Sequence, residues 1–175
     1  MKKSLIKWQI AGFIFTGIMG VLLHFLYDLT GQNVFVAPFS AVNESIWEHM
    51  KLLFYPMFVF AIIESRFTGK DYKNFWCVKL IGIVLGILTI PVIYYTYNGA
   101  FGSSRDWVNI AIFFIAAAII YFIETKLLNR GKPSCNRPLA AFSVLCLIAL
   151  IFIEFTFIPP HLPLFADPIT KTFGI

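Results

Sequence analysis

The chain has 175 residues, of which 59% are hydrophobic, 18% aromatic and only 13% charged. A soluble domain carries roughly 25% charged residues, so this composition excludes an ordinary soluble fold and predicts one integral membrane domain over residues 1–175. The net charge of +5 does not indicate a nucleic-acid partner, because the basic residues lie in short segments between apolar runs, where they set membrane topology.

Five apolar stretches are each about 20 residues long, the length at which a helix crosses a bilayer. Backbone groups find no water inside lipid, so a helix is the only economical conformation for such runs. The expected spans are 8–27, 43–63, 76–97, 107–128 and 138–158, followed by a tail over 159–175. The sequence therefore predicts an all-α fold, a polytopic transmembrane bundle of five helices.

Positive charge is distributed unevenly between the two sides of this bundle. The side with the N-terminus and the segments 64–79 and 124–137 carries 11 of the 14 basic residues and three acids, and the other side carries three basic residues and six acids. Basic segments stay in the cytoplasm, so the N-terminus is predicted inside and the C-terminus outside. We expect a multi-pass protein of a cell membrane, here a bacterial cytoplasmic membrane, with membrane lipid around it.

The first span and the cysteines bear on targeting and compartment. The apolar run after Lys2 and Lys3 is too long for the core of a signal peptide and no small-residue cleavage site follows it, so a retained helix is expected. Cys77 and Cys135 fall on the side assigned to the cytoplasm and Cys146 lies inside a span. All three are expected to be reduced thiols.

Tryptophan, proline and glycine mark features of the spans. One tryptophan lies at or near the start of each of the first four spans, which is typical of an aromatic belt and assigns none of them a ligand role: Trp8, Trp47, Trp76 and Trp107. Pro56 and Pro91 should bend the second and third spans. Gly82 and Gly86 predict close helix packing within the chain, with contact in a homo-oligomer as the alternative.

Ionisable residues gather on the outer side, where membrane depth makes them costly and therefore candidates for function. They include all three histidines, most of the acids and one lysine: His24, Asp28, Glu44, Glu48, His49, Lys51, Glu154, His161 and Asp167. In the inner half of the spans we expect no charge deep in the lipid, because Lys79 and Glu124 lie near span ends and can extend toward water.

The second span holds the densest part of this set. Ser40 or Asn43 is expected to cap its first turn. Glu44, Glu48 and Lys51 recur at i, i+4 and i+7 and so share one helix face, where a Glu48–Lys51 pair would offset the desolvation of both ions. This spacing predicts one polar face on the second span.

Two further groups extend the set from the end of the chain. Glu154 lies in an apolar run and needs a partner, for which Lys51 and the helix histidines are the nearest candidates by depth. The proline-rich tail is too apolar for a solvated segment, so an extended lid across the outer mouth is expected, carrying His161 and Asp167, with disorder as the alternative.

Three segments together carry a family resemblance: His24–Asp28, Leu164–Pro168 and the run Asn-Glu-Ser-Ile-Trp-Glu-His from Asn43 to His49. They resemble an uncharacterised family of small bacterial membrane proteins, a domain of unknown function, in which Asn-Glu-Ser-x-Trp-Glu-His is the most specific motif. The resemblance covers nearly the whole chain and implies the five-span architecture. It implies no activity.

Three classes of function remain open. Imidazole and carboxylate ligands suit Zn²⁺, Mn²⁺ or Fe²⁺, and an open position would let the metal activate water for hydrolysis of a small-molecule or lipid-linked substrate. The candidate metal ligands are His24, His49, His161, Glu154 and Asp167. The candidate catalytic residues are Glu44, Glu48 and Lys51, with Glu44 or Glu48 as the base.

The second class is transport or binding of a small solute, ion or proton, since acids and a lysine on bent helices are typical of coupled pathways. The inner half offers no polar route, and five short spans would need a homo-oligomer for this role. The third class is a non-enzymatic scaffold, assembly factor or sensor, in which the polar residues form a buried network that fixes the fold.

Overall fold

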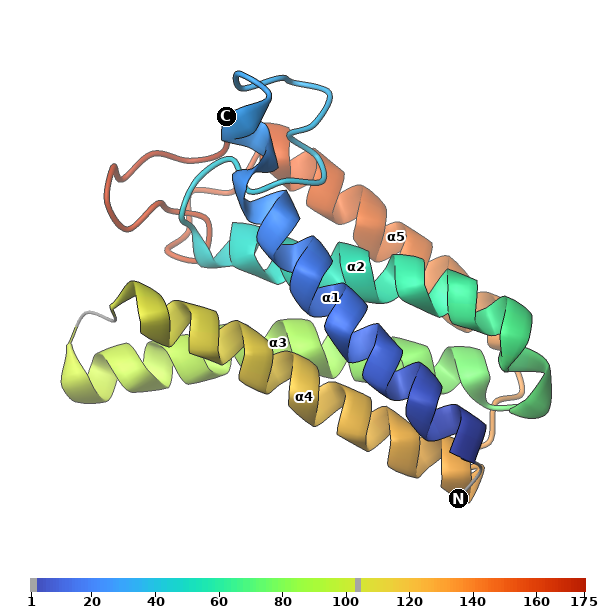
Figure 1. The fold of residues 1–175 in the computed structure, drawn as a ribbon. Coiled ribbons are helices and arrows are strands. Elements are labelled where there is room, and N and C mark those ends of the chain that lie inside the picture. Colours follow the sequence, from blue (N-terminus) through green and yellow to red (C-terminus); the bar gives the residue numbers. More distant parts are fainter. Residues whose placement is uncertain (1–2, 103–104) are drawn as a thin grey trace.

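The computed structural model describes residues 3–102 and 105–175, so Lys2, counted above with the N-terminal positive charge, lies outside the described residues. Five helices follow one another (Figure 1): α1 (Lys3–Leu29), α2 (Ile46–Phe67), α3 (Phe75–Phe101), α4 (Asp106–Arg130) and α5 (Pro138–Phe157), with a short 3₁₀ turn η1 (Gly69–Asp71) between α2 and α3. Each of the five is long and apolar enough to cross a membrane, which confirms the predicted all-helical bundle of five spans.

Helix α2 is the central element. In its most apolar 18-residue window 78% of the residues are buried inside the protein, against 22% to 44% for the other four helices. The other helices expose apolar side chains such as Ile10, Ile14 and Ile18 of α1, as a surface in contact with lipid requires. Glu48, Lys51 and Glu64 of α2 are buried and therefore face protein and not lipid.

Small residues set the distances between the helices. At Gly86 an added Cβ would lie 3.1 Å from Ile120 and 3.2 Å from Leu53, so α3 packs closely against α4 and α2. A Cβ at Gly82 would collide with the Glu124 side chain. The close packing predicted for these two glycines is thus found within the chain.

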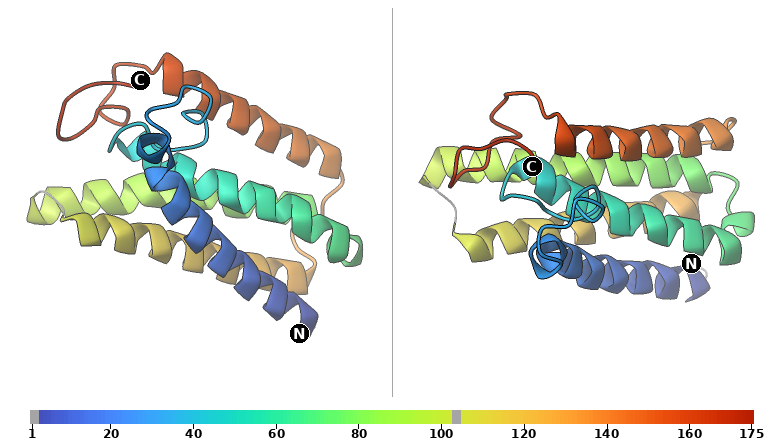
Figure 2. Two further views of the ribbon diagram at one scale, coloured as in Figure 1. Left: turned by 45° about the horizontal axis from the view of Figure 1, so that its top comes forward. Right: turned by 90° about the horizontal axis from the view of Figure 1, so that it is seen from above.

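The connections alternate between the two ends of the bundle (Figure 2). The α1–α2 loop and the tail lie together over the start of α2, whereas the N-terminus, the α2–α3 turn and the α4–α5 loop lie at the opposite end. These ends are called here the tail end and the N-terminal end. The inside and outside assignment of the two ends remains the prediction made from charge.

The start of α2 differs from the expectation. Ser45 is the N-cap, and its hydroxyl accepts from the Glu48 backbone N–H at 3.4 Å. Ser40 instead accepts from the Tyr27 N–H at 2.8 Å, near the end of α1. The predicted caps and the predicted helical position of Glu44 are therefore wrong, because α2 begins at Ile46 and Glu44 belongs to the preceding loop.

The tail folds back onto α2 instead of extending into solvent. Trp47 is buried between Phe152 of α5 and Phe165 of the tail, with ring centroids 4.5 and 4.7 Å away. The backbone N–H of Trp47 donates to Leu164 O at 3.1 Å. Trp47 is thus an anchor for the tail and not part of an aromatic belt, since its ring lies on the protein-facing side of α2.

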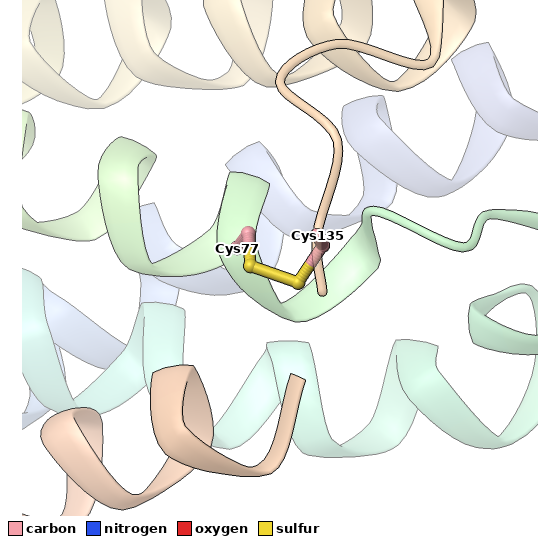
Figure 3. The surroundings of a disulfide bond; sticks show 2 residues. All are labelled: Cys77 and Cys135. Carbon is pink, nitrogen blue, oxygen red and sulfur yellow. A yellow bond between two sulfur atoms is a disulfide. The ribbon is translucent and has the colours of Figure 1, made fainter. Parts of the chain in front are cut away.

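A disulfide joins Cys77 near the start of α3 to Cys135 in the α4–α5 loop (Figure 3), with 5.7 Å between the two Cα atoms. The expectation of three free thiols is therefore wrong for this pair, and Cys146 is free. The loop after α4 crosses α3, and the sequence separation of 58 residues gives no sign of that crossing.

Candidate functional site

Three residues that could share a metal ion meet at the tail end of the bundle. His24 is in the last two turns of α1, Glu44 in the α1–α2 loop, and His49 in the first turn of α2. His24 Nε2 lies 3.8 Å from Glu44 Oε1, and His49 Nε2 lies 3.6 Å from Glu44 Oε2. The two imidazole rings are 5.6 Å apart between centroids, so the carboxylate faces both of them.

Hydrogen bonding fixes the tautomer of neutral His49. Its Nδ1 lies 2.9 Å from the Ser45 carbonyl oxygen, which can only accept, so Nδ1 carries the proton. The Nε2 lone pair then points toward Glu44. A backbone carbonyl that binds one ring nitrogen and frees the other is the usual support of a metal-ligating histidine.

The distances within the cluster suit a cation between the three groups. Both nitrogen–oxygen separations exceed the 3.2 Å limit of an ordinary hydrogen bond. Ligands about 2.0–2.1 Å from a tetrahedral zinc ion lie about 3.3 Å from one another. The two nitrogen–oxygen separations are a few tenths of an ångström longer, and ligand atoms of all three residues lie within 4.8 Å of one another. Glu44 is 46% exposed at its side chain, so a bound ion would keep a side open to solvent.

The tail holds Glu44 in place. Asp167 Oδ2 accepts from the Glu44 backbone N–H at 3.0 Å, and Asp167 Oδ1 accepts from Ile169 N and Thr170 N at 2.7 and 2.9 Å. Burial raises the pKa of Asp167, but these hydrogen bonds outweigh it and hold the pKa below its ordinary value. Asp167 is thus an ionised clamp that joins the tail to the loop before α2.

A pocket adjoins the cluster between α2, α3 and α4. Its volume is about 20 Å³, and its lining holds both apolar and polar side chains. Besides these two residues, it is lined by Ile46, Ile90, Tyr94, Asn109, Ile112 and Phe113. A space of this size holds about one water molecule beside Glu44 and His49.

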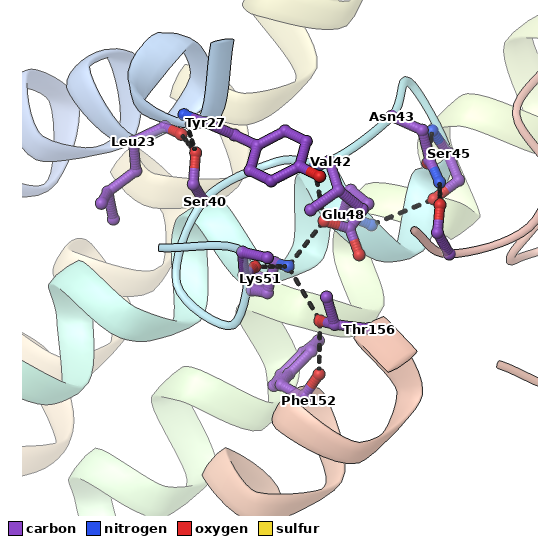
Figure 4. Close-up of polar contacts among 12 residues, drawn as sticks. Leu23, Tyr27, Ser40, Val42, Asn43, Ser45, Glu48, Lys51, Phe152 and Thr156 are labelled. Carbon is purple, nitrogen blue, oxygen red and sulfur yellow. Dashed lines mark hydrogen bonds and ion pairs between the residues drawn. The ribbon is translucent and has the colours of Figure 1, made fainter. Parts of the chain in front are cut away.

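Glu48 and Lys51 form a separate buried network (Figure 4). Lys51 Nζ lies 2.6 Å from Glu48 Oε2 and donates to Ala37 O at 2.9 Å and to Thr156 Oγ1 at 3.0 Å, so all three ammonium donors are used. Glu48 Oε2 also accepts from Val42 N at 3.0 Å. The pair ties α2 to the α1–α2 loop and to α5, and its predicted catalytic role stays a prediction.

The remaining candidates lie apart from the cluster. Glu154 is exposed on α5 and is not brought to Lys51 or the histidines. His161 is exposed and stacks on Phe173 of the tail at 4.6 Å. Asp167 supports Glu44 through the backbone and is not in the group that could hold an ion.

A second buried network lies at the N-terminal end, where no deep charge was expected. Lys79 Nζ lies 2.7 Å from Glu64 Oε2 and 2.6 Å from Glu124 Oε2, and Gln9 Nε2 donates to Glu64 Oε1 at 2.7 Å. None of the four residues is more than 3% exposed. The expectation that Lys79 and Glu124 extend toward water is wrong, because α1 to α4 enclose them. All four residues lie at a similar distance from the N-terminal end of the bundle. This shared depth is the feature of the sequence that could have predicted their contact.

A model of a family of unknown function, DUF6512, matches residues 1–175. Comparisons with curated proteins and with solved structures gave no match. The resemblance noted from the sequence is confirmed as membership of an uncharacterised family with five candidate membrane spans. The chain belongs to DUF6512, a family of unknown function.

Proposed function

We propose that this chain is a membrane-embedded, metal-dependent hydrolase whose divalent ion is bound by His24, Glu44 and His49. The observation that carries the proposal is the Glu44 carboxylate between two imidazole nitrogens at 3.6 and 3.8 Å, with the His49 tautomer set by Ser45 O. Without a cation, the lone pair of neutral His49 would face a carboxylate, and two acceptors repel each other. Two histidines and one glutamate are also a ligand set of catalytic zinc sites.

The chemistry follows from the open side of the cluster. A zinc ion held by three protein ligands lowers the pKa of a bound water to about 7 and supplies a nucleophile at neutral pH. In this arrangement Glu44 is a metal ligand, whereas the sequence analysis proposed it as a candidate general base. His24 and His49 come from two different helices, so the fold of the bundle sets the geometry of the site.

We infer a lipid or lipid-linked substrate, because Glu44 is partly exposed and the bundle around the cluster presents apolar side chains to lipid. Exposed apolar side chains of α3 and α4, such as Val92 and Ile110, would contact its apolar chain. A substrate with a polar head at the cluster and its chain along α3 and α4 would stay within the membrane boundary. Ester, phosphoester or amide hydrolysis of such a molecule is the reaction class that the cluster suits.

Metal analysis of the protein purified in detergent without chelators tests the proposal, followed by zinc reloading and dialysis. We expect close to one bound ion per wild-type chain and loss of binding in His24→Ala and in His49→Ala. His161→Ala is the matched control, since His161 lies outside the cluster, and it should keep the ion. A wild type that takes up no metal after reloading would refute the proposal and leave an imidazolium–carboxylate cluster.

Hydrolytic activity is tested separately on the metal-loaded protein. Fluorogenic esters, phosphoesters and amides that carry an acyl chain should be cleaved by the wild type and by His161→Ala, but not by His49→Ala. Chelator should abolish the cleavage and added zinc restore it. Metal binding without cleavage of any of the three classes would keep the metal site and refute the hydrolase assignment.

A further inference from the structure

The buried network of Glu64, Lys79 and Glu124 has an unbalanced charge. Two carboxylates and one ammonium ion carry a net charge of −1 when all three are ionised. The groups that face them are the neutral side chains of Gln9 on α1 and Tyr121 on α4, and Tyr121 in turn shares a 2.8 Å hydrogen bond with Thr16. A net charge enclosed at this depth is costly, so the network needs one more positive charge.

The hydrogen bonds show where a positive charge is missing. Glu64 Oε1 accepts from Gln9 Nε2 at 2.7 Å, and Glu64 Oε2 has no hydrogen bond but lies 2.7 Å from Lys79 Nζ as an ion pair. Glu124 uses only Oε2, toward Lys79 at 2.6 Å. Glu124 Oε1 and Gln9 Oε1 are buried and have no hydrogen-bond partner within the described residues. The carboxylate of Glu124 therefore keeps one oxygen that neither a hydrogen bond nor an ion pair reaches among the described residues.

A metal ion fits this position poorly. The Lys79 ammonium already lies between the two carboxylates, at 2.6 and 2.7 Å, and would repel a second cation. Gly82 packs so closely on Glu124 that even a methyl group there would collide with the side chain. A proton needs no such space.

We propose that this network is a proton-binding site, in which Glu124 Oε1 takes up one proton while Lys79 and Glu64 remain an ion pair. The proton comes from water at the N-terminal end of the bundle and binds the carboxylate, giving a neutral carboxyl group and a neutral network. Release returns the proton to water and restores the negative charge. Glu124 is six residues from Arg130 at the end of α4, about 9 Å along the helix axis, so the exchange path is short.

Infrared spectroscopy of the detergent-purified protein tests this site through the carbonyl stretch of a protonated carboxylic acid. We expect the wild type to show this band at about pH 7, where unperturbed glutamate is ionised, and to lose it reversibly as the pH is raised. Glu124→Gln should remove the band. Lys79→Met should raise the signal to about two protonated carboxyls, because both acids then lack a cation.

Glu154→Gln is the matched control, since Glu154 is an exposed acid on α5. It should leave the band unchanged. A band that disappears in Glu154→Gln and survives in Glu124→Gln would overturn the proposal, as would a wild type without the band between about pH 5 and pH 8. The wild-type titration decides the question even if Lys79→Met fails to fold. Metal content at the tail end should not change in any of these variants.

Discussion

Replacing Lys51 with methionine should destabilise the protein strongly, because it removes the only cation that the structure pairs with the buried Glu48 carboxylate among the described residues. Lys51 is 0% exposed and Glu48 1% exposed, so water cannot replace the ammonium group. Breaking a buried pair by removing one partner costs about 3–5 kcal/mol. The same change leaves Ala37 O and Thr156 Oγ1 without the donor that Lys51 Nζ supplies.

The magnitude can be measured as a double-mutant cycle. A loss of about 3–5 kcal/mol shifts the folding equilibrium by roughly two to three and a half orders of magnitude. Denaturant unfolding in mixed micelles, followed by circular dichroism, would measure it. Glu48→Gln/Lys51→Met should recover most of the loss, because a neutral pair of similar volume leaves no buried charge. If Lys51→Met stays within about 1 kcal/mol of wild type, or if the two changes add, the reasoning about this ion pair fails.

Two further predictions concern the tail and the disulfide. The depressed pKa of Asp167 means that its stabilisation is present above the unfolded value of about 3.9 and is lost as the pH falls through the folded value, so Asp167→Asn should remove that acid-dependent component of thermal stability. An unchanged acid profile in Asp167→Asn would contradict the clamp. Alkylation at cell lysis should find one free thiol before reduction and three after it, and Cys77→Ser should free Cys135. Three free thiols in the unreduced protein would refute the disulfide.

The disulfide also bears on orientation. Cys77 and Cys135 lie at the end of the bundle whose basic segments predict a cytoplasmic location. Cytoplasmic thiols are kept reduced, so a disulfide in cells would place this end on the oxidising side of the membrane and reverse the predicted topology. The alkylation experiment therefore decides between the charge argument and the covalent bond.

The five helices could be predicted from the sequence because each needs only a long apolar run, a property of contiguous residues. The start of α2 could not, since Glu44 suits a helical first turn in isolation. The tail decides otherwise: Asp167, 123 residues away, takes the Glu44 N–H. The contact with a distant residue therefore outweighs the local helix propensity of this segment.

The candidate site was predicted only in part, because the sequence shows how deep a residue lies but not which residues meet. His24 and His49 both lie near the tail end by depth, and the fold brings them to one carboxylate. Depth alone could not separate these histidines from Glu154. Whether Glu154 faces the bundle depends on the rotation of α5 about its axis. The sequence of α5 has little amphipathic pattern from which that rotation could be predicted. Glu64, Lys79 and Glu124 were overlooked because each is close enough to a helix end to reach water as a single helix.

The clamp between the tail and the α1–α2 loop sets an order of assembly. Asn43 Nδ2 donates to Gly174 O at 3.1 Å and Glu44 N to Asp167 at 3.0 Å, so this loop obtains partners that follow α5 in the chain. Thr156 of α5 likewise completes the bonding of Lys51. During synthesis α1 and α2 are made before these partners. The backbone of Glu44 therefore lacks its hydrogen bond to the tail until the fifth helix and the tail have been added. The cluster of His24, Glu44 and His49 would be one of the last parts of the protein to mature.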